Sequence, residues 1–195
     1  MIFKIFNKDE LPKLFEVLSE NIIVGPVEKG RDRKNQPLYS FESVKKISDL
    51  KLDYTHTKSS PKKYFLPYYE TLCTFKVEKE SWSKTVDYNV YKPLVFFGMH
   101  ACDINALNKL DKVLLKSVYP TPYYASKRMN MFIVGMDCVP QPFCFCRDMG
   151  TDTVQHGFDM FLTDLGDRYF VEILSAAAFN YLQCLETRAP SSLRS

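Results

Sequence analysis

The sequence predicts an α/β fold in which a mixed, partly parallel sheet is flanked by helices and followed by a C-terminal β-hairpin. Two continuous apolar runs, PLVFFGM (93–99) and MFIVGMD (131–137), lack polar alternation, which is typical of strands covered on both faces. Between them, residues 104–118 repeat apolar side chains every three or four positions, which predicts an amphipathic helix. Strand, helix and strand in this order predict a βαβ crossover between parallel strands.

Shorter patterns predict the elements around this unit. Residues 8–19 are expected to form a helix with Asn7 as its N-cap. Residues 21–27, NIIVGPV, predict a short strand that its Gly and Pro stop. Residues 157–174 predict the C-terminal hairpin, which turns at Gly166.

The length and composition predict one main domain. Of the 195 residues, 46% are hydrophobic, which is enough to close one ordinary core. We expect residues 1–174 to form a single α/β domain carrying one cysteine cluster, and residues 175–195 to form a C-terminal tail. Within the domain, residues 63–77 predict two extended pieces with a bend at Pro67.

Charge and hydropathy exclude several classes of protein. A formal net charge of +3, from 26 basic and 23 acidic side chains, does not predict nucleic-acid binding. No apolar run approaches the roughly 20 residues of a membrane-spanning helix. The N-terminus becomes charged at once and does not resemble a signal peptide, so the sequence predicts a cytoplasmic protein.

The six cysteines point to metal chemistry. In a reducing compartment, clustered cysteines more often bind metals or act in catalysis than form structural disulfides. Cys102 follows the first apolar strand and Cys138 follows the second. Because parallel strands end at the same sheet edge, where open α/β sheets bind ligands, we expect both to meet there. Cys144 and Cys146 follow in the same loop, so four thiolates are predicted to converge.

The chemistry of four thiolates leaves three interpretations open: an iron–sulfur cluster, a tetrahedral zinc site, or no metal. The C-x-C pair of Cys144 and Cys146 favours the cluster, because structural zinc favours pairs two or more residues apart. The surroundings are aromatic and proline-rich, and Pro140, Pro142, Phe143 and Phe145 are expected to form a dry, rigid wall that tunes a cluster potential. Without a metal, Cys102 and Cys138 would be core residues.

Other polar residues near the cysteines have simpler expected roles. A nucleophilic cysteine with His100 or His156 as base is a weaker alternative. Asp103 and Asn105 are expected to cap the helix that follows them. The sequence contains no phosphate loop, GxGxxG or catalytic triad, so no catalytic residue and no direct nucleotide binding are predicted.

Three motifs in order resemble the iron–sulfur subunits of the anaerobic sulfite reductases and the beta subunits of the sulfhydrogenases or sulfur reductases. They are GMHACDINALNKLD, CVPQPFCFCRDMGTD and GFDMFLTDLGDRYFVE, preceded by a P-x-x-E-x-L segment. The matching positions are Pro67, Glu70, Leu72, Cys102, Asp103, Ala106, Leu110, Asp111, Cys138, Cys144, Cys146, Met149, Gly150 and Thr151. The resemblance covers the N-terminal portion of that family, from about residue 60 to residue 174.

The resemblance implies an oxidoreductase component that transfers electrons without being catalytic itself. It would carry an iron–sulfur cluster, expected to be [4Fe-4S], on Cys102, Cys138, Cys144 and Cys146. Its partners would be a catalytic reductase or hydrogenase subunit and an electron-transfer subunit that binds flavin and NAD(P)H. Family members continue into a ferredoxin-like domain, before which this sequence is expected to be truncated. The alternative function is a zinc-bound or metal-free module that docks redox subunits.

Overall fold

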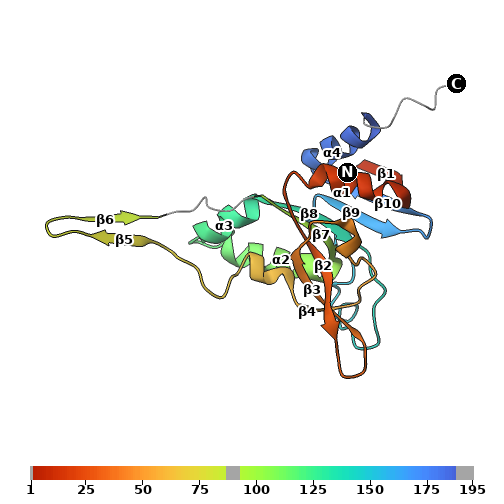
Figure 1. Cartoon of the computed structure of the whole chain (residues 1–195), viewed down its shortest axis with the longest axis horizontal. Coiled ribbons are helices and arrows are strands. Elements are labelled where there is room, and N and C mark those ends of the chain that lie inside the picture. Colours follow the sequence, from red (N-terminus) through yellow and green to blue (C-terminus); the bar gives the residue numbers. More distant parts are fainter. Residues whose placement is uncertain (1, 87–92, 188–195) are drawn as a thin grey trace.

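The computed structural model describes residues 2–86 and 93–187, with side chains up to Gln183. Its main element is an eight-stranded sheet (Figure 1). The strands, in their order across the sheet, are β1 (Ile2–Asn7), β10 (Arg168–Ile173), β9 (Met160–Asp164), β8 (Met131–Met136), β7 (Leu94–His100), β2 (Ile22–Arg31), β3 (Pro37–Ser43) and β4 (Thr57–Ser59). The central strands β2, β7, β8 and β9 are parallel. Strand β10 is antiparallel to both β1 and β9, whereas β3 is antiparallel to β2 and parallel to β4.

Two helical layers cover the two faces of the sheet. Helices α1 (Leu11–Leu18) and α4 (Ala176–Thr187) pack on one face, where Leu14, Leu18 and Leu182 join a buried cluster with Val95, Phe97 and Val134. Helices α2 (Ala101–Leu114) and α3 (Pro122–Met129) cover the other face, where Ile104, Leu107 and Tyr124 pack with Phe96 and Ile133. Successive residues of β7 and β8 are therefore buried on opposite faces, which explains their unbroken apolar sequence.

Three short 3₁₀ helices complete the domain: η1 (Lys8–Glu10), η2 (Ile47–Asp49) and η3 (Pro61–Tyr64). Asn7 and Glu10 form a capping box at η1, so the expected cap is present one short helix ahead of α1. Helix α4 begins at Ala176 and buries Ala178 and Leu182 in the same cluster as α1.

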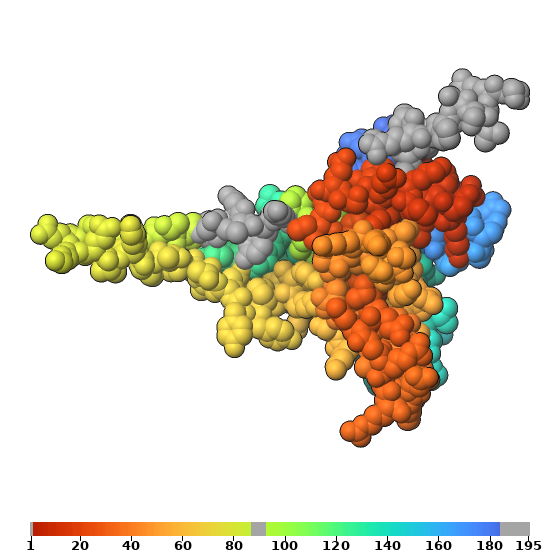
Figure 2. Space-filling view, in the orientation of Figure 1, coloured from red at the N-terminus to blue at the C-terminus, as the bar shows by residue number. Residues whose placement is uncertain are grey.

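A two-stranded hairpin stands apart from the main sheet. Among the described residues, strands β5 (Thr74–Val77) and β6 (Trp82–Thr85) pair only with each other. In Figures 1 and 2 this hairpin projects from the molecule as an arm. At its base, the hydroxyl of Tyr123 donates to the carbonyl of Leu72, and Lys127 forms an ion pair with Glu70. The arm is thus tied to α3.

The predicted α/β class, its parallel centre and its C-terminal hairpin are confirmed. Strands β9 and β10 pair antiparallel around Gly166, which has a φ of 99°. The predicted end of the strand at 21–27 is wrong, because β2 continues to Arg31. Pro26 lies past the stretch where β2 pairs with β7, so its missing N–H removes no bond from that ladder.

The expected extended segments at 63–77 are only half correct. Residues up to Tyr64 belong to η3, whose N-cap Ser60 accepts a hydrogen bond from the backbone N–H of Lys62. Only Thr74–Val77 forms a strand. No helix within the described part of the chain is long and apolar enough to cross a membrane.

Candidate metal centre

The four candidate cysteines lie at the carboxyl edge of the parallel strands. Cys102 is the second residue of α2, directly beyond β7, and Cys138 follows the end of β8 by two residues. Strands β7 and β8 are parallel neighbours, so these two cysteines leave the sheet on the same side. Cys144 and Cys146 lie in the segment 137–159, which connects β8 to β9.

The thiols interact with one another across this edge. The Cys102 thiol lies close enough to Cys138 and Cys146 for their charges to act on it. Burial, then the negative charge of Asp103 and the neighbouring thiols, raises the pKa of Cys102 to about 12. Burial also raises the pKa of Cys138 to about 11, with Cys146, Asp137 and Cys144 contributing. The structure thus brings Cys102, Cys138 and Cys146 within electrostatic range of one another, and Cys144 within electrostatic range of Cys138.

The arrangement fits soft metals in its donor chemistry. Among the described residues, however, no three His, Cys, Asp or Glu side chains are arranged as a ready-made site for a metal ion. Four neighbouring thiols are the donor set that iron–sulfur clusters and thiolate zinc sites use. With raised pKa values, Cys102 and Cys138 are protonated at neutral pH in the absence of metal, so binding must release their protons.

Short turns shape the loop that carries three of the cysteines. The N–H of Cys144 donates to the carbonyl of Gln141 at 2.9 Å, and the N–H of Gln141 donates back to the Cys144 sulfur at 3.3 Å. The N–H of Thr151 donates to the carbonyl of Cys146 at 2.7 Å. Gly150, with a φ of 60°, lets the chain turn between them. These contacts place Cys144 and Cys146 on two successive turns.

The expected dry aromatic wall around the cysteines is wrong. Phe143 is 89% exposed and Phe145 is 73% exposed, and Val139 and Met149 in the same loop are also exposed. The loop has no regular secondary structure between 137 and 159. Its Phe158 is buried in the core, but Phe143 and Phe145 are not. The side of the site formed by Phe143 and Phe145 is therefore an apolar outer surface, which is typical of partner binding.

Helix α2 supplies polar contacts to the loop that the sequence did not reveal. The side-chain amide of Asn105 donates to the carbonyls of Thr151 at 3.3 Å and Thr153 at 2.7 Å. The expected capping role of Asn105 is therefore wrong. Its position one turn beyond Cys102, on the same helix face, is the signal that would have predicted a role at the site.

The other two polar residues of this region also differ from expectation. His100, rather than Asp103, occupies the N-cap position of α2. Asp103 lies in the first turn and accepts a hydrogen bond from the hydroxyl of Ser60 at 3.4 Å, while burial raises its pKa to about 6. The His100 ring is 3% exposed and stacks on Tyr54 with centroids 4.0 Å apart. Burial lowers its pKa to about 4, which suits a neutral packing residue.

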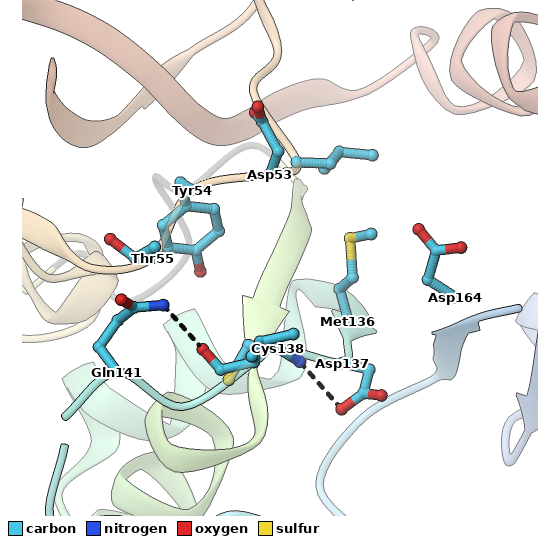
Figure 3. Close-up of a pocket in the computed structure, with 10 residues that line it drawn as sticks. Asp53, Tyr54, Thr55, Met136, Asp137, Cys138, Gln141 and Asp164 are labelled. Carbon is cyan, nitrogen blue, oxygen red and sulfur yellow. Dashed lines mark hydrogen bonds between the residues drawn. The ribbon is translucent and has the colours of Figure 1, made fainter. Parts of the chain in front are cut away.

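A cavity of about 380 Å³ opens beside Cys138. Figure 3 shows Tyr54, Asp53 and Gln141 on one side of it and Met136 and Asp164 on the other. The side-chain amide of Gln141 donates to the carbonyl of Val139, and the N–H of Cys138 donates to the carboxylate of Asp137. Through this cavity, solvent and small molecules can reach Cys138.

Comparison with known proteins relates the chain to a family. No family model matches it, and no solved structure matches it. It is 36% identical over 177 residues to sulfhydrogenase 2 subunit beta of Pyrococcus furiosus. This match supports a place for the chain in the sulfhydrogenase beta-subunit family. The match covers 90% of the chain and 49% of the relative, so the chain spans about half the length of that beta subunit.

The match to a sulfhydrogenase beta subunit confirms the sulfhydrogenase part of the resemblance drawn from the motifs. The matched region leaves out only about a tenth of the chain. A continuous match of that extent includes residues 102–146, and therefore all four candidate cysteines.

Proposed function

We propose that this chain is an electron-transfer part of a sulfhydrogenase-like complex and holds one iron–sulfur cluster, of the [4Fe-4S] type, on Cys102, Cys138, Cys144 and Cys146. The observation that carries the proposal is that Cys102 and Cys138 follow two parallel neighbouring strands at one sheet edge, within electrostatic range of each other and of Cys146. The family relationship supports the redox role. The chain itself performs no catalysis in this proposal.

When bound, the cluster would supply a one-electron carrier. The protein around the cysteines would determine the reduction potential of the cluster. Cys102 lies in the first turn of α2, where the positive end of the helix dipole favours a thiolate and opposes the effect of burial. Turns of the 137–159 loop hold Cys144 and Cys146 in place. The cavity beside Cys138 keeps one flank open to solvent, which tunes a cluster potential.

The partners in this proposal are other subunits. The relative is named as a beta subunit of a sulfhydrogenase, which implies an assembly. Electrons would pass between a catalytic reductase or hydrogenase subunit and an electron-transfer subunit that binds flavin and NAD(P)H. The ferredoxin-like domain implied by the resemblance would come from sequence outside these 195 residues. A cytoplasmic location belongs to the same proposal, because free clustered cysteines suit a reducing compartment.

Metal analysis of anaerobically prepared protein tests the proposal. Wild type should be brown, absorb broadly at about 400 nm, and contain iron and acid-labile sulfide in equal amounts. Single Cys→Ser variants at 102, 138, 144 and 146 should lose most of the iron. Cys73→Ser is the matched control, because Cys73 lies in the segment before the arm, and it should keep the iron. Iron-free wild type, or full iron in all four variants, would refute the cluster.

A second candidate function is a zinc-bound or metal-free module that docks redox subunits. The exposed aromatic residues Phe143 and Phe145, together with Phe75 and Trp82 of the arm, favour it. Colourless protein containing one zinc per chain, or none, together with binding to the partner subunits, would select this function over electron transfer.

A further inference from the structure

A chain of hydrogen bonds links the helix that carries Cys102 to the backbone of Cys146. Asn105 lies one turn after Cys102 on α2, and its amide donates to the carbonyls of Thr151 and Thr153. Thr151 in turn donates twice to the carbonyl of Cys146, from its N–H at 2.7 Å and from its hydroxyl at 3.2 Å. The path from Cys102 to Cys146 thus passes through Asn105 and Thr151.

The chemistry of this link requires an amide. Within the described residues, none of the backbone N–H groups of turns and loops donates to the carbonyls of Thr151 or Thr153, so side chains or water must satisfy them. A side-chain amide carries two N–H donors and can serve two carbonyls at once. A carboxylate of the same shape carries none and would repel both oxygens.

The hydroxyl of Thr151 strengthens the same connection. Its backbone N–H and its side chain both donate to one carbonyl oxygen, that of Cys146. Two donors on one carbonyl fix the orientation of the peptide that follows Cys146. The direction in which the Cys146 side chain leaves the backbone is therefore coupled to α2.

We propose that Asn105 and Thr151 are positioning residues that hold the Cys146 thiol near the Cys102 thiol. The link acts through the backbone and does not touch the sulfur atoms. The positioning concerns the thiols themselves, and only its use for a metal cluster rests on the proposed function.

Asn108 provides a matched control on the same helix. Its amide donates to the carbonyl of His156 at 2.8 Å, and it packs against Gly157. It therefore ties down the same loop with the same chemistry, but close to β9 rather than close to Cys146. A purely structural role for Asn105 predicts equal effects of the two asparagines on the thiols.

The rate of disulfide formation in the metal-free chain measures how often the Cys102 and Cys146 thiols come together. Diamide takes one hydrogen atom from each of two thiols, forming the disulfide and being reduced to its hydrazine, and peptide mapping identifies the pair. Wild type should form the Cys102–Cys146 disulfide fastest of all pairs. Asn105→Ala and the isosteric Asn105→Asp should slow it about tenfold, as expected for two lost hydrogen bonds. Asn108→Ala should leave the rate within about twofold of wild type.

A milder variant covers the case in which Asn105 variants do not fold, as judged by circular dichroism. Thr151→Val keeps the shape and the backbone N–H but removes the hydroxyl donor, and it should slow trapping about threefold. Equal trapping rates in wild type and Thr151→Val, equal rates in Asn105→Ala and Asn108→Ala, or no Cys102–Cys146 disulfide in wild type would overturn the proposal.

Iron content distinguishes this inference from the proposed function. If wild type contains no iron but trapping depends on Asn105, the cluster fails and the positioning role stands. If wild type contains a cluster but trapping is the same in every variant, the positioning role fails alone. In cluster-loaded protein, Asn105→Asp should also shift the reduction potential and the electron paramagnetic resonance spectrum, whereas Asn108→Ala should not.

Discussion

The hydroxyl of Tyr54 donates a buried hydrogen bond of 2.8 Å to the carbonyl oxygen of Gly98. Tyr54 comes from the segment between η2 and β4, whereas Gly98 lies inside β7. Strand β7 has a bulge at this point, because the pairing with β8 shifts between Phe97 and Met99. The phenol therefore satisfies a carbonyl at an irregular point of a central strand, shortly before the candidate metal centre begins.

Replacing Tyr54 with Phe should lower the free energy of unfolding by about 1–2 kcal/mol, because the Gly98 carbonyl would lose its buried partner. Urea unfolding followed by circular dichroism measures the change. Tyr68→Phe is the control, since Tyr68 is 90% exposed, and it should change stability by less than about 0.5 kcal/mol. Equal stability of the Tyr54 variant and wild type would show that water replaces the phenol.

Gly98→Ala should destabilise the protein by about 2 kcal/mol or more. The residue has a φ of +83°, and an added Cβ would lie 2.8 Å from the side chain of Leu52. Gly166→Ala separates these two causes, because Gly166 has a φ of +99° with no atom within 4 Å of the added Cβ. The Gly166 variant should lose only about 1 kcal/mol, the cost of the backbone conformation. A larger loss at Gly166 than at Gly98 would contradict the role given to the Leu52 contact.

Tyr64→Phe should weaken the loss of stability at alkaline pH. Burial raises the pKa of Tyr64 from about 10 to about 12, so the unfolded chain loses this proton first as pH rises. The folded state then binds more protons, and stability contributed by Tyr64 is complete below pH 10 and falls up to pH 12. Between about pH 10 and 12 the wild type should lose roughly 2 kcal/mol more than the variant.

Denaturant unfolding at a series of pH values measures this difference. Tyr69→Phe is the control, because Tyr69 is 95% exposed, and it should follow the wild-type profile. Parallel profiles for wild type and Tyr64→Phe would show that the phenol of Tyr64 titrates alike in the folded and unfolded chains.

Removing the arm should leave the domain stable. Thr74 and Thr85 are opposite each other in the β5–β6 pair, so a Gly-Gly link can replace residues 74–85. Phe75, Val77 and Trp82 are each more than half exposed, so the deletion should change the free energy of unfolding by less than about 1 kcal/mol. Calorimetry of the deletion variant against wild type tests this. A loss of several kcal/mol would show that the arm packs on the domain.

The central strands and the helix between them could be predicted from the sequence, because burial imposes a recognisable apolar pattern on each. Strands β7 and β8 are covered on both faces and read as continuous apolar runs, and α2 shows helical spacing. The course of β2 could not be predicted in the same way. Its continuation past Pro26 depends on which neighbour pairs at that position, and this is a property of the assembled sheet.

The candidate site shows the same division. The positions of Cys102 and Cys138 at one edge follow from two parallel strands, so the topology alone predicts that they lie near each other. The exposure of Phe143 and the bonds of Asn105 do not follow from local pattern. An aromatic residue enters a core only if the loop reaches one, and an asparagine near a helix start can serve a cap or a distant carbonyl equally well.

The connection between β8 and β9 gives the cysteine loop a wider mechanical importance. These strands are parallel neighbours, and such a pair is usually joined by a helical crossover that packs on the sheet. Here residues 137–159 make the crossover without a helix. Oxidants that attack these thiols would therefore modify the segment that joins two inner strands of the sheet, so that redox damage and unfolding would share one starting point.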